Sequence, residues 1–155
     1  MTVPARPVPT QLAPPTLETL LDDHAIQRLL CDELEAVADG LPTLPPLCAM
    51  RRLCDKILWI TTTHFARAER ILGSLPPGHG PSEVELSILH QMHQLDEVHA
   101  QDLVAELWSH AAGRPNGGVG QLGYMLRCFF DGGRRAIALK ESWITDGTRP
   151  MGTPP

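Results

Sequence analysis

The densest group of side chains that could do chemistry in this 155-residue chain lies at residues 90–99, HQMHQLDEVH. The stretch holds three histidines and two adjacent carboxylates. Imidazole nitrogens and carboxylate oxygens are the ligands that proteins offer to zinc and to non-haem iron. Whether they form a metal site depends on which of them face the interior of the fold.

Proline and glycine clusters divide the chain into long segments with helical periodicity. The clusters are GLPTLPP at 40–46, LPPGHGP at 75–81 and GRPNGG at 113–118. The expected helices cover residues 16–39, 46–72, 82–112 and 121–144. No strand-like alternation of useful length occurs. Four long helices joined by short loops predict an all-α fold, an antiparallel up-down-up-down four-helix bundle.

The composition, with 43% apolar and 20% charged residues, is that of one globular domain, which we expect over residues 16–145. We predict that the proline-rich leader, residues 1–15, and the tail, residues 146–155, are disordered. The leader lacks the apolar core of a signal peptide. No stretch approaches the roughly 18 apolar residues of a membrane span. The sequence therefore predicts a cytoplasmic protein without a membrane partner.

Charge and cysteine usage argue against a nucleic-acid-binding protein and against a disulfide-stabilised fold. The net charge of −5 comes without a basic stripe, so nucleic acid is not an expected partner. The cysteines show no CxxC or CxxH spacing, which indicates reduced core residues of an intracellular protein. They are Cys31, Cys48, Cys54 and Cys128.

Helical periodicity separates the histidines of the third segment. At about 100° per residue, His93 and Glu97 lie within its apolar stripe. His99 points about 120° away from His93, and His90 lies at the margin of the stripe. We therefore expect His93 and Glu97 to face the interior and the other two histidines to lie towards the surface.

The first two segments supply further inward histidines. His64 is the single polar residue at the centre of the apolar stripe of the second segment, and His24 shares a face with leucines of the first. In an antiparallel pair, two residues lie at one height when their sequence midpoint falls in the connecting turn. The midpoints are 44 for His24 and His64 and 78.5 for His64 and His93, both inside turn clusters. One such histidine alone is usually a core imidazole with a polar neighbour, but a layer of several with Glu97 favours metal.

The order and spacing of these motifs resemble the hemerythrin-like, or HHE cation-binding, domain, a four-helix bundle that holds a non-haem di-iron centre. The resemblance covers the chain from about Leu17 to Trp143. Its motifs correspond to DDHAIQRLLCDELEAV, HFARAERIL, MHQLDEVHAQDLVAEL and RRAIALKESWI in the four helices. The metal ligands that this resemblance implies are His24, His64, His93 and Glu97.

Some positions depart from the family's pattern. Ala68 stands at the bridging-carboxylate position of the second helix, and Glu69 follows one residue later. Ala136 stands at the fourth-helix histidine position, at the height of Glu97, since their midpoint of 116.5 lies in the third turn cluster. Glu141 is a candidate fifth ligand, because the fourth-helix carboxylate of some relatives follows that histidine by five residues, and Glu69 is a candidate sixth.

Lys140 stands where the pattern has a carboxylate, four residues after Ala136. It shares a face with Phe129 and Trp143, so its ammonium could reach the interior of the bundle and take the place of a metal's charge, paired with Glu97. Alternatively, its side chain could extend along apolar surface to solvent.

Two functions remain open from the sequence. The resemblance implies a hemerythrin-like non-haem iron-binding protein, mononuclear or di-iron, that binds or senses oxygen, nitric oxide or iron itself. The same ligands would accept zinc. We expect binding rather than turnover, because no nucleophile or acid–base pair stands apart from the ligands. The alternative is a metal-free helical-bundle interaction protein without a cofactor, in which Lys140 replaces the metal charge and the protein partner is unspecified.

Overall fold

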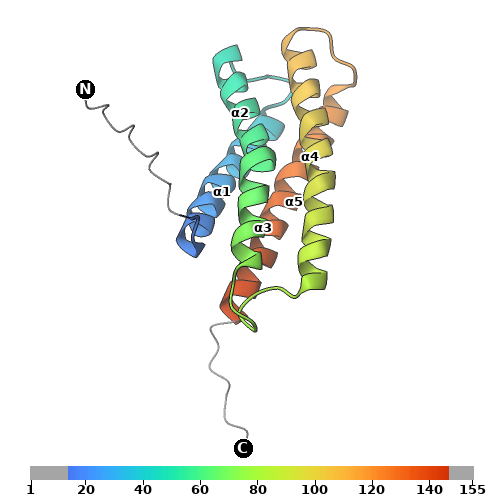
Figure 1. The fold of residues 1–155 in the computed structure, drawn as a ribbon. Coiled ribbons are helices and arrows are strands. Elements are labelled where there is room, and N and C mark those ends of the chain that lie inside the picture. Colours follow the sequence, from blue (N-terminus) through green and yellow to red (C-terminus); the bar gives the residue numbers. More distant parts are fainter. Residues whose placement is uncertain (1–13, 147–155) are drawn as a thin grey trace, which may run out of the picture.

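A computed structural model describes residues 14–146 of the chain. Its elements are α1 (Leu17–Gly40), α2 (Leu47–Trp59), the π-helix η1 (Ile60–His64), α3 (Phe65–Gly73), α4 (Glu83–Ala111) and α5 (Val119–Asp146). Because α2, η1 and α3 follow one another without a break, they form one rod, and the chain makes four long helical segments (Figure 1). Within the described range there is no strand, so the predicted all-α class is confirmed.

The predicted helix limits agree with the observed ones to within about two residues. The predicted leader and tail, residues 1–15 and 146–155, lie almost wholly outside the described residues. Across residues 14–146, no helix combines the length and the hydropathy that a membrane crossing requires.

Capping residues fix where two of the helices begin. The Thr16 side chain accepts a hydrogen bond from the Thr19 backbone at the start of α1, and Ser82 does the same for Glu85 at the start of α4. In both cases the backbone N–H of the first residue also donates a hydrogen bond to the side chain of the second, which completes a capping box. The two capping boxes satisfy backbone N–H groups at the starts of α1 and α4, the helices that carry His24 and His93.

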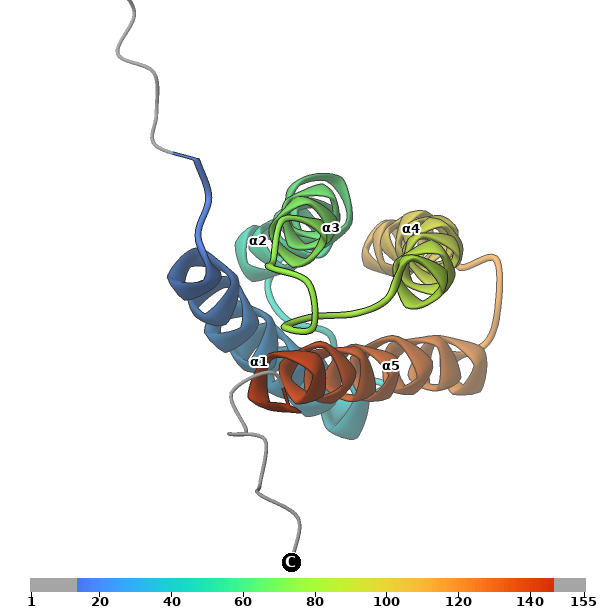
Figure 2. The ribbon, with the colours of Figure 1, turned by 60° about the horizontal axis from the view of Figure 1, so that its bottom comes forward.

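The helices lie beside one another as a bundle. Seen from one end, α1 lies next to α5, and the α2–α3 rod lies next to α4 (Figure 2). At Gly133 of α5, an added Cβ would lie 3.3 Å from Cys31 Sγ and 3.4 Å from Gln27 Nε2, both on α1. Glycine at this position permits α1 and α5 to approach closely, and α5 remains helical throughout DGG at 131–133.

The interior has two apolar clusters. The large apolar cluster includes Leu30, Leu34, Met50, Ile57, Leu107 and Leu122. The small apolar cluster consists of Leu20, Ala68, Ile71, Leu72 and Leu89. Between the two lies a buried polar layer, which we define as His24, His64, His93 and Lys140. The layer interrupts an otherwise apolar core.

Candidate functional site

Each of the four helical segments contributes one residue to the polar layer. His24 comes from α1, His64 from the last residue of η1, His93 from α4 and Lys140 from α5. The exposed fractions are 0% for His24, His64 and Lys140 and 4% for His93. The three histidines therefore face the interior, as their periodicity predicts, and Lys140 reaches the interior rather than solvent.

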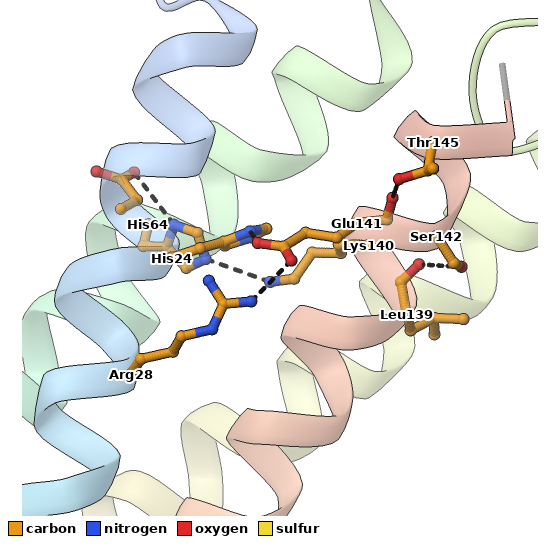
Figure 3. A network of polar contacts seen from close by, with 9 residues as sticks. His24, Arg28, His64, Leu139, Lys140, Glu141, Ser142 and Thr145 are labelled. Atoms are coloured by element: carbon orange, nitrogen blue, oxygen red, sulfur yellow. Dashed lines mark hydrogen bonds and ion pairs between the residues drawn. The ribbon is translucent and has the colours of Figure 1, made fainter. Parts of the chain in front are cut away.

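A chain of polar contacts crosses the bundle through His64. Lys140 Nζ lies 3.2 Å from His64 Nε2 (Figure 3), and Nδ1 of the same ring lies 3.1 Å from Asp23 Oδ2. Arg67 then holds both oxygens of Asp23, with Nε at 2.8 Å and a terminal nitrogen at 2.7 Å. The lysine of α5 is thus connected to α1 and to the α2–α3 rod.

The partners of His64 fix its proton. An ionised carboxylate only accepts hydrogen bonds, so Nδ1 carries the hydrogen and donates it to Asp23. In a neutral imidazole the other nitrogen, Nε2, then has a lone pair, and this lone pair accepts a hydrogen bond from the Lys140 ammonium. Both nitrogens of His64 therefore have hydrogen-bond partners without a metal ion.

His24 and His93 also face carboxylates through Nδ1. His24 Nδ1 lies 3.0 Å from Glu141 Oε1, and a terminal nitrogen of Arg28 lies 2.7 Å from Oε2 of the same glutamate (Figure 3). His93 Nδ1 lies 2.6 Å from Glu69 Oε1, whose other oxygen lies 2.9 Å from His90 Nδ1. All three histidines of the layer thus donate from Nδ1 and present Nε2 as an acceptor.

Two of these acceptors have no partner. His24 Nε2 and His93 Nε2 are both buried and make no hydrogen bond. The rings are held from the sides, because His93 stacks on Phe65 with ring centroids 3.9 Å apart and His24 meets His64 edge-on at 5.5 Å. The layer therefore contains unused lone pairs in fixed positions beside a cation.

Burial and the lysine charge keep the three imidazoles neutral. Burial, followed by the charge of Lys140, lowers the pKa of His24 to about 4, that of His64 to about 2 and that of His93 to about 4. At neutral pH none of them competes with Lys140 as the cation of the layer.

Lys140 is itself shifted in the same direction. Burial lowers its pKa to about 8, and the nearby charges of Asp96, Glu69 and Asp23 limit the shift. At pH 7 the group is an ammonium. Asp96 lies on α4 and has a raised pKa because it is partly buried, although His99 and Lys140 act against that rise.

The carboxylates are arranged differently from the sequence prediction. Glu97 is half-buried, and among residues 14–146 it makes no hydrogen bond or ion pair. Lys140 contacts His64 rather than Glu97, and the α4 carboxylate whose charge acts on it is Asp96. Glu141 and Glu69, proposed as metal ligands, bind histidine Nδ1 atoms instead.

Sequence reasoning missed Asp23 and Arg67. Asp23 is 3% exposed although it precedes a residue that already faces the core. A signal was present, since Arg67 follows His64 by three residues and so lies on the same side of the rod, where a buried acid could pair with it.

The small side chain of Ala136 borders a cavity of about 270 Å³, lined mainly by α4 and α5 and also by residues of α1, η1 and α3. Phe65, Met125 and Phe129 supply apolar walls, and Asp96 supplies a carboxylate. The cavity lies at the position on α5 where the resemblance described above would predict a histidine.

The donor set fits a metal ion only in part. Metal-binding histidines commonly donate their second nitrogen to a carboxylate, which His24, His64 and His93 all do. However, the His64 Nε2 lone pair that a metal would need accepts a hydrogen bond from the Lys140 ammonium. Among the residues that the structure describes, no three histidine, cysteine, aspartate or glutamate side chains gather closely enough to hold an ion. As placed, these residues do not fit a metal without displacement of Lys140.

Comparisons with known proteins found no matching family model, no matching curated protein and no matching solved structure. The function therefore has to be argued from the geometry of the polar layer and from the surface of the bundle.

Proposed function

We propose that this chain is a hemerythrin-like, antiparallel up-down-up-down four-helix bundle that works without metal, as an interaction protein whose interior cation is Lys140. The observation that carries the proposal is the 3.2 Å contact between Lys140 Nζ and His64 Nε2. A metal ion and an ammonium proton would use the same lone pair, so each excludes the other. The loops of Figure 1, which join neighbouring helices at alternate ends, support the antiparallel topology.

Burial of Lys140 supports a permanent role for this cation. Its side chain is 0% exposed, so the ammonium cannot leave the layer unless the bundle opens. A buried charge network contributes less to net stability than to specificity, because desolvation offsets most of the Coulombic attraction. In this proposal the layer fixes how the four helices align, and the outer faces of the bundle carry the interaction.

Metal analysis combined with thermal unfolding tests the proposal. Protein expressed with added iron should contain far less than one metal ion per chain, and a chelator should leave its Tm unchanged. The chain has two lysines, which provide a matched pair of variants. Lys140→Met frees the His64 lone pair, so added zinc should raise the Tm of this variant. It should not raise the Tm of wild type or of Lys56→Met, because Lys56 is surface-exposed and pairs with Glu33.

Stoichiometric iron in the wild-type protein, together with a Tm that falls on chelation, would overturn the metal-free proposal. A zinc response shared by all three proteins would show that the metal binds elsewhere. A folded wild type whose Tm is the same in chelator, iron and zinc supports it.

Iron binding is a second proposal, favoured by a specific observation. His24 Nε2 and His93 Nε2 are buried acceptors without partners, and each ring is oriented by a carboxylate on Nδ1. If Lys140 turned away, these imidazoles and His64 could hold non-haem iron or zinc with open positions for oxygen or nitric oxide. The same metal analysis decides between the proposals. Here the wild type would carry iron, His93→Ala would lose it, and nitric oxide would change the absorption spectrum.

A further inference from the structure

The outer face of α4 carries an apolar stripe that is unusual for a solvent-exposed helix. Its apolar members are Val84, Ile88, Leu95 and Val98, with exposed fractions of 69%, 52%, 62% and 54%. Together with Gln91 they are spaced by four and three residues in turn, which keeps all five within about 40° of one line on the helix. We call this set the α4 stripe.

The α4 stripe lies on the side of the helix opposite the polar layer. His93 is nine residues after Val84, about 180° around the helix. Seen end-on, α4 stands at an edge of the bundle, with the α2–α3 rod and α5 on its inner sides (Figure 2). Alternating spacings of four and three residues are the pattern of a coiled-coil seam, in which a second helix covers the stripe.

The stripe is nearly symmetric about its centre, with a valine at each end and an isoleucine or leucine on each side of Gln91. Val84 and Val98 have their midpoint at residue 91, and Ile88 and Leu95 have theirs at 91.5. A second copy of α4 laid antiparallel would therefore place valine against valine and leucine against isoleucine. Gln91 would face its own copy, where the two amides can hydrogen-bond to each other.

Flanking charges distinguish an antiparallel from a parallel pairing. Glu85 and His99 are both exposed and lie on the same flank of the stripe, about 100° and 60° from its centre. Their midpoint is residue 92, so an antiparallel pair brings the glutamate of one copy to the histidine of the other. In a parallel pair, Glu85 of one copy and His99 of the other would lie 14 residues, about 21 Å, apart along the helices and could not meet. Antiparallel helices also align their dipoles favourably.

From this symmetry we propose that the α4 stripe is the surface on which two copies of this chain associate, antiparallel, about a twofold axis at Gln91. The proposal names a partner for the interaction role given above. The functional meaning of the dimer rests on the proposed interaction role. Its formation does not depend on the polar layer, since the stripe does not contact that layer. Four apolar residues a side make an interface smaller than the standard of about 800 Å² per partner, so the dimer is weak, with a Kd of roughly 10–100 µM.

Sedimentation equilibrium over a range of protein concentrations tests the association. Wild type should pass from monomer to dimer as concentration rises. Leu95→Glu, which places a carboxylate opposite Ile88 of the second copy, should raise Kd at least tenfold. Leu29→Glu is the matched control, because Leu29 is 64% exposed but lies on α1, and its Kd should equal that of wild type. Monomeric wild type at every concentration, or equal effects of the two variants, would overturn the proposal.

Cross-linking tests the axis. In a background where the exposed Cys48 and Cys128 are serine, Gln91→Cys should be joined to its copy by a short bismaleimide. Val98→Cys lies seven residues away, which separates the two sites by about 21 Å in an antiparallel pair, so it should not be joined. Efficient linkage at both positions would indicate a parallel pair and would refute the proposed arrangement.

Failure of the dimer and failure of the metal-free interior give different results. A monomer whose Tm is unaffected by chelator would remove the second copy and leave the interior as proposed. A dimer that carries iron would support the second copy and overturn the metal-free interior.

Discussion

The large apolar cluster and the polar layer are equally buried but are built from opposite chemistry. Leu34, Met50 and Leu107 are 0% exposed, and so are His64 and Lys140. The apolar residues gain free energy in proportion to the area that they remove from water, whatever the pH. The polar residues lose hydration on burial, and each offsets part of that loss with at least one polar contact.

The difference teaches that burial alone does not show what a residue contributes. In the apolar cluster, loss of one side chain leaves a void whose cost depends on its volume. In the polar layer, loss of one partner leaves the others charged or unpaired, and the effect depends on pH. The two regions should therefore respond differently to mutation and to titration.

Lys140→Glu should break the polar layer most severely. It removes the only ammonium of the layer and adds a carboxylate near Asp23, Glu69 and Asp96, all of which act on this position. We expect unfolding free energy to fall by about 3–5 kcal/mol, the range for leaving a buried charge without its partner, measured by urea unfolding at pH 7. A loss below about 1 kcal/mol would mean that Lys140 does not hold the layer together.

Leu34→Ala probes the large apolar cluster in the same way. The side chain is 0% exposed, so its truncation should lower unfolding free energy by about 2–5 kcal/mol. The loss should be the same at pH 7 and pH 5.5, because no titrating group is removed. A loss that changes with pH would show that the apolar cluster and the polar layer are energetically coupled.

Alkaline titration separates the two lysines. The folded-state pKa of Lys140 is about 8 and the ordinary value is 10.5, so between these pH values the unfolded chain binds a proton that the folded chain does not. Stability from this group therefore rises with pH over that window, by up to about 3 kcal/mol. Lys56→Met should retain the rise and Lys140→Met should lose it.

The comparison between the two variants is needed because buried thiols oppose the rise. Burial raises the pKa of Cys31 and of Cys54 to about 11, so deprotonation in the unfolded chain lowers stability above pH 9. This effect is common to both variants and cancels in their difference. Identical pH profiles for the two would show that Lys140 is not shifted.

Acid titration of single histidines should give an effect of similar size, spread over the acid range. The pKa of His93 is about 4 in the folded protein against 6.5 ordinarily, so its stabilisation is complete above pH 6.5 and is lost as pH falls towards 4. In His93→Gln, the unfolding free energy should decrease less steeply with falling pH, by about 1 kcal/mol per pH unit. His79→Gln is the matched control variant, because His79 is exposed and lies outside the polar layer.

The helices and the inward histidines could be predicted because both depend on backbone geometry. Proline and glycine clusters end helices for local reasons, and a period of 3.6 residues then fixes which side of each helix is buried. His24, His64 and His93 follow from that rule alone. The antiparallel height test adds only the assumption of short connecting turns.

The partners of the histidines could not be predicted, because they depend on the length and rotamer of side chains. Glu69 lies about 140° from His64 on its own helix, yet its side chain is long enough to reach His93 on α4. Asp96 and Glu97 differ by one position, or 100°, and a small rotation of α4 decides which of them faces Lys140. Periodicity does not resolve rotations of that size.

Because the Lys140 ammonium is covalently part of the chain, the polar layer does not depend on a supply of cations from solution. An ion from solution occupies a site according to its concentration, and chelators, dilution or a competing metal can remove it. A lysine side chain is made with the chain, is present once in every copy and has no dissociation constant. If the metal-free proposal holds, with Lys140 Nζ as the cation beside His64, this bundle would assemble in the same way in a cell rich in iron as in one that has none.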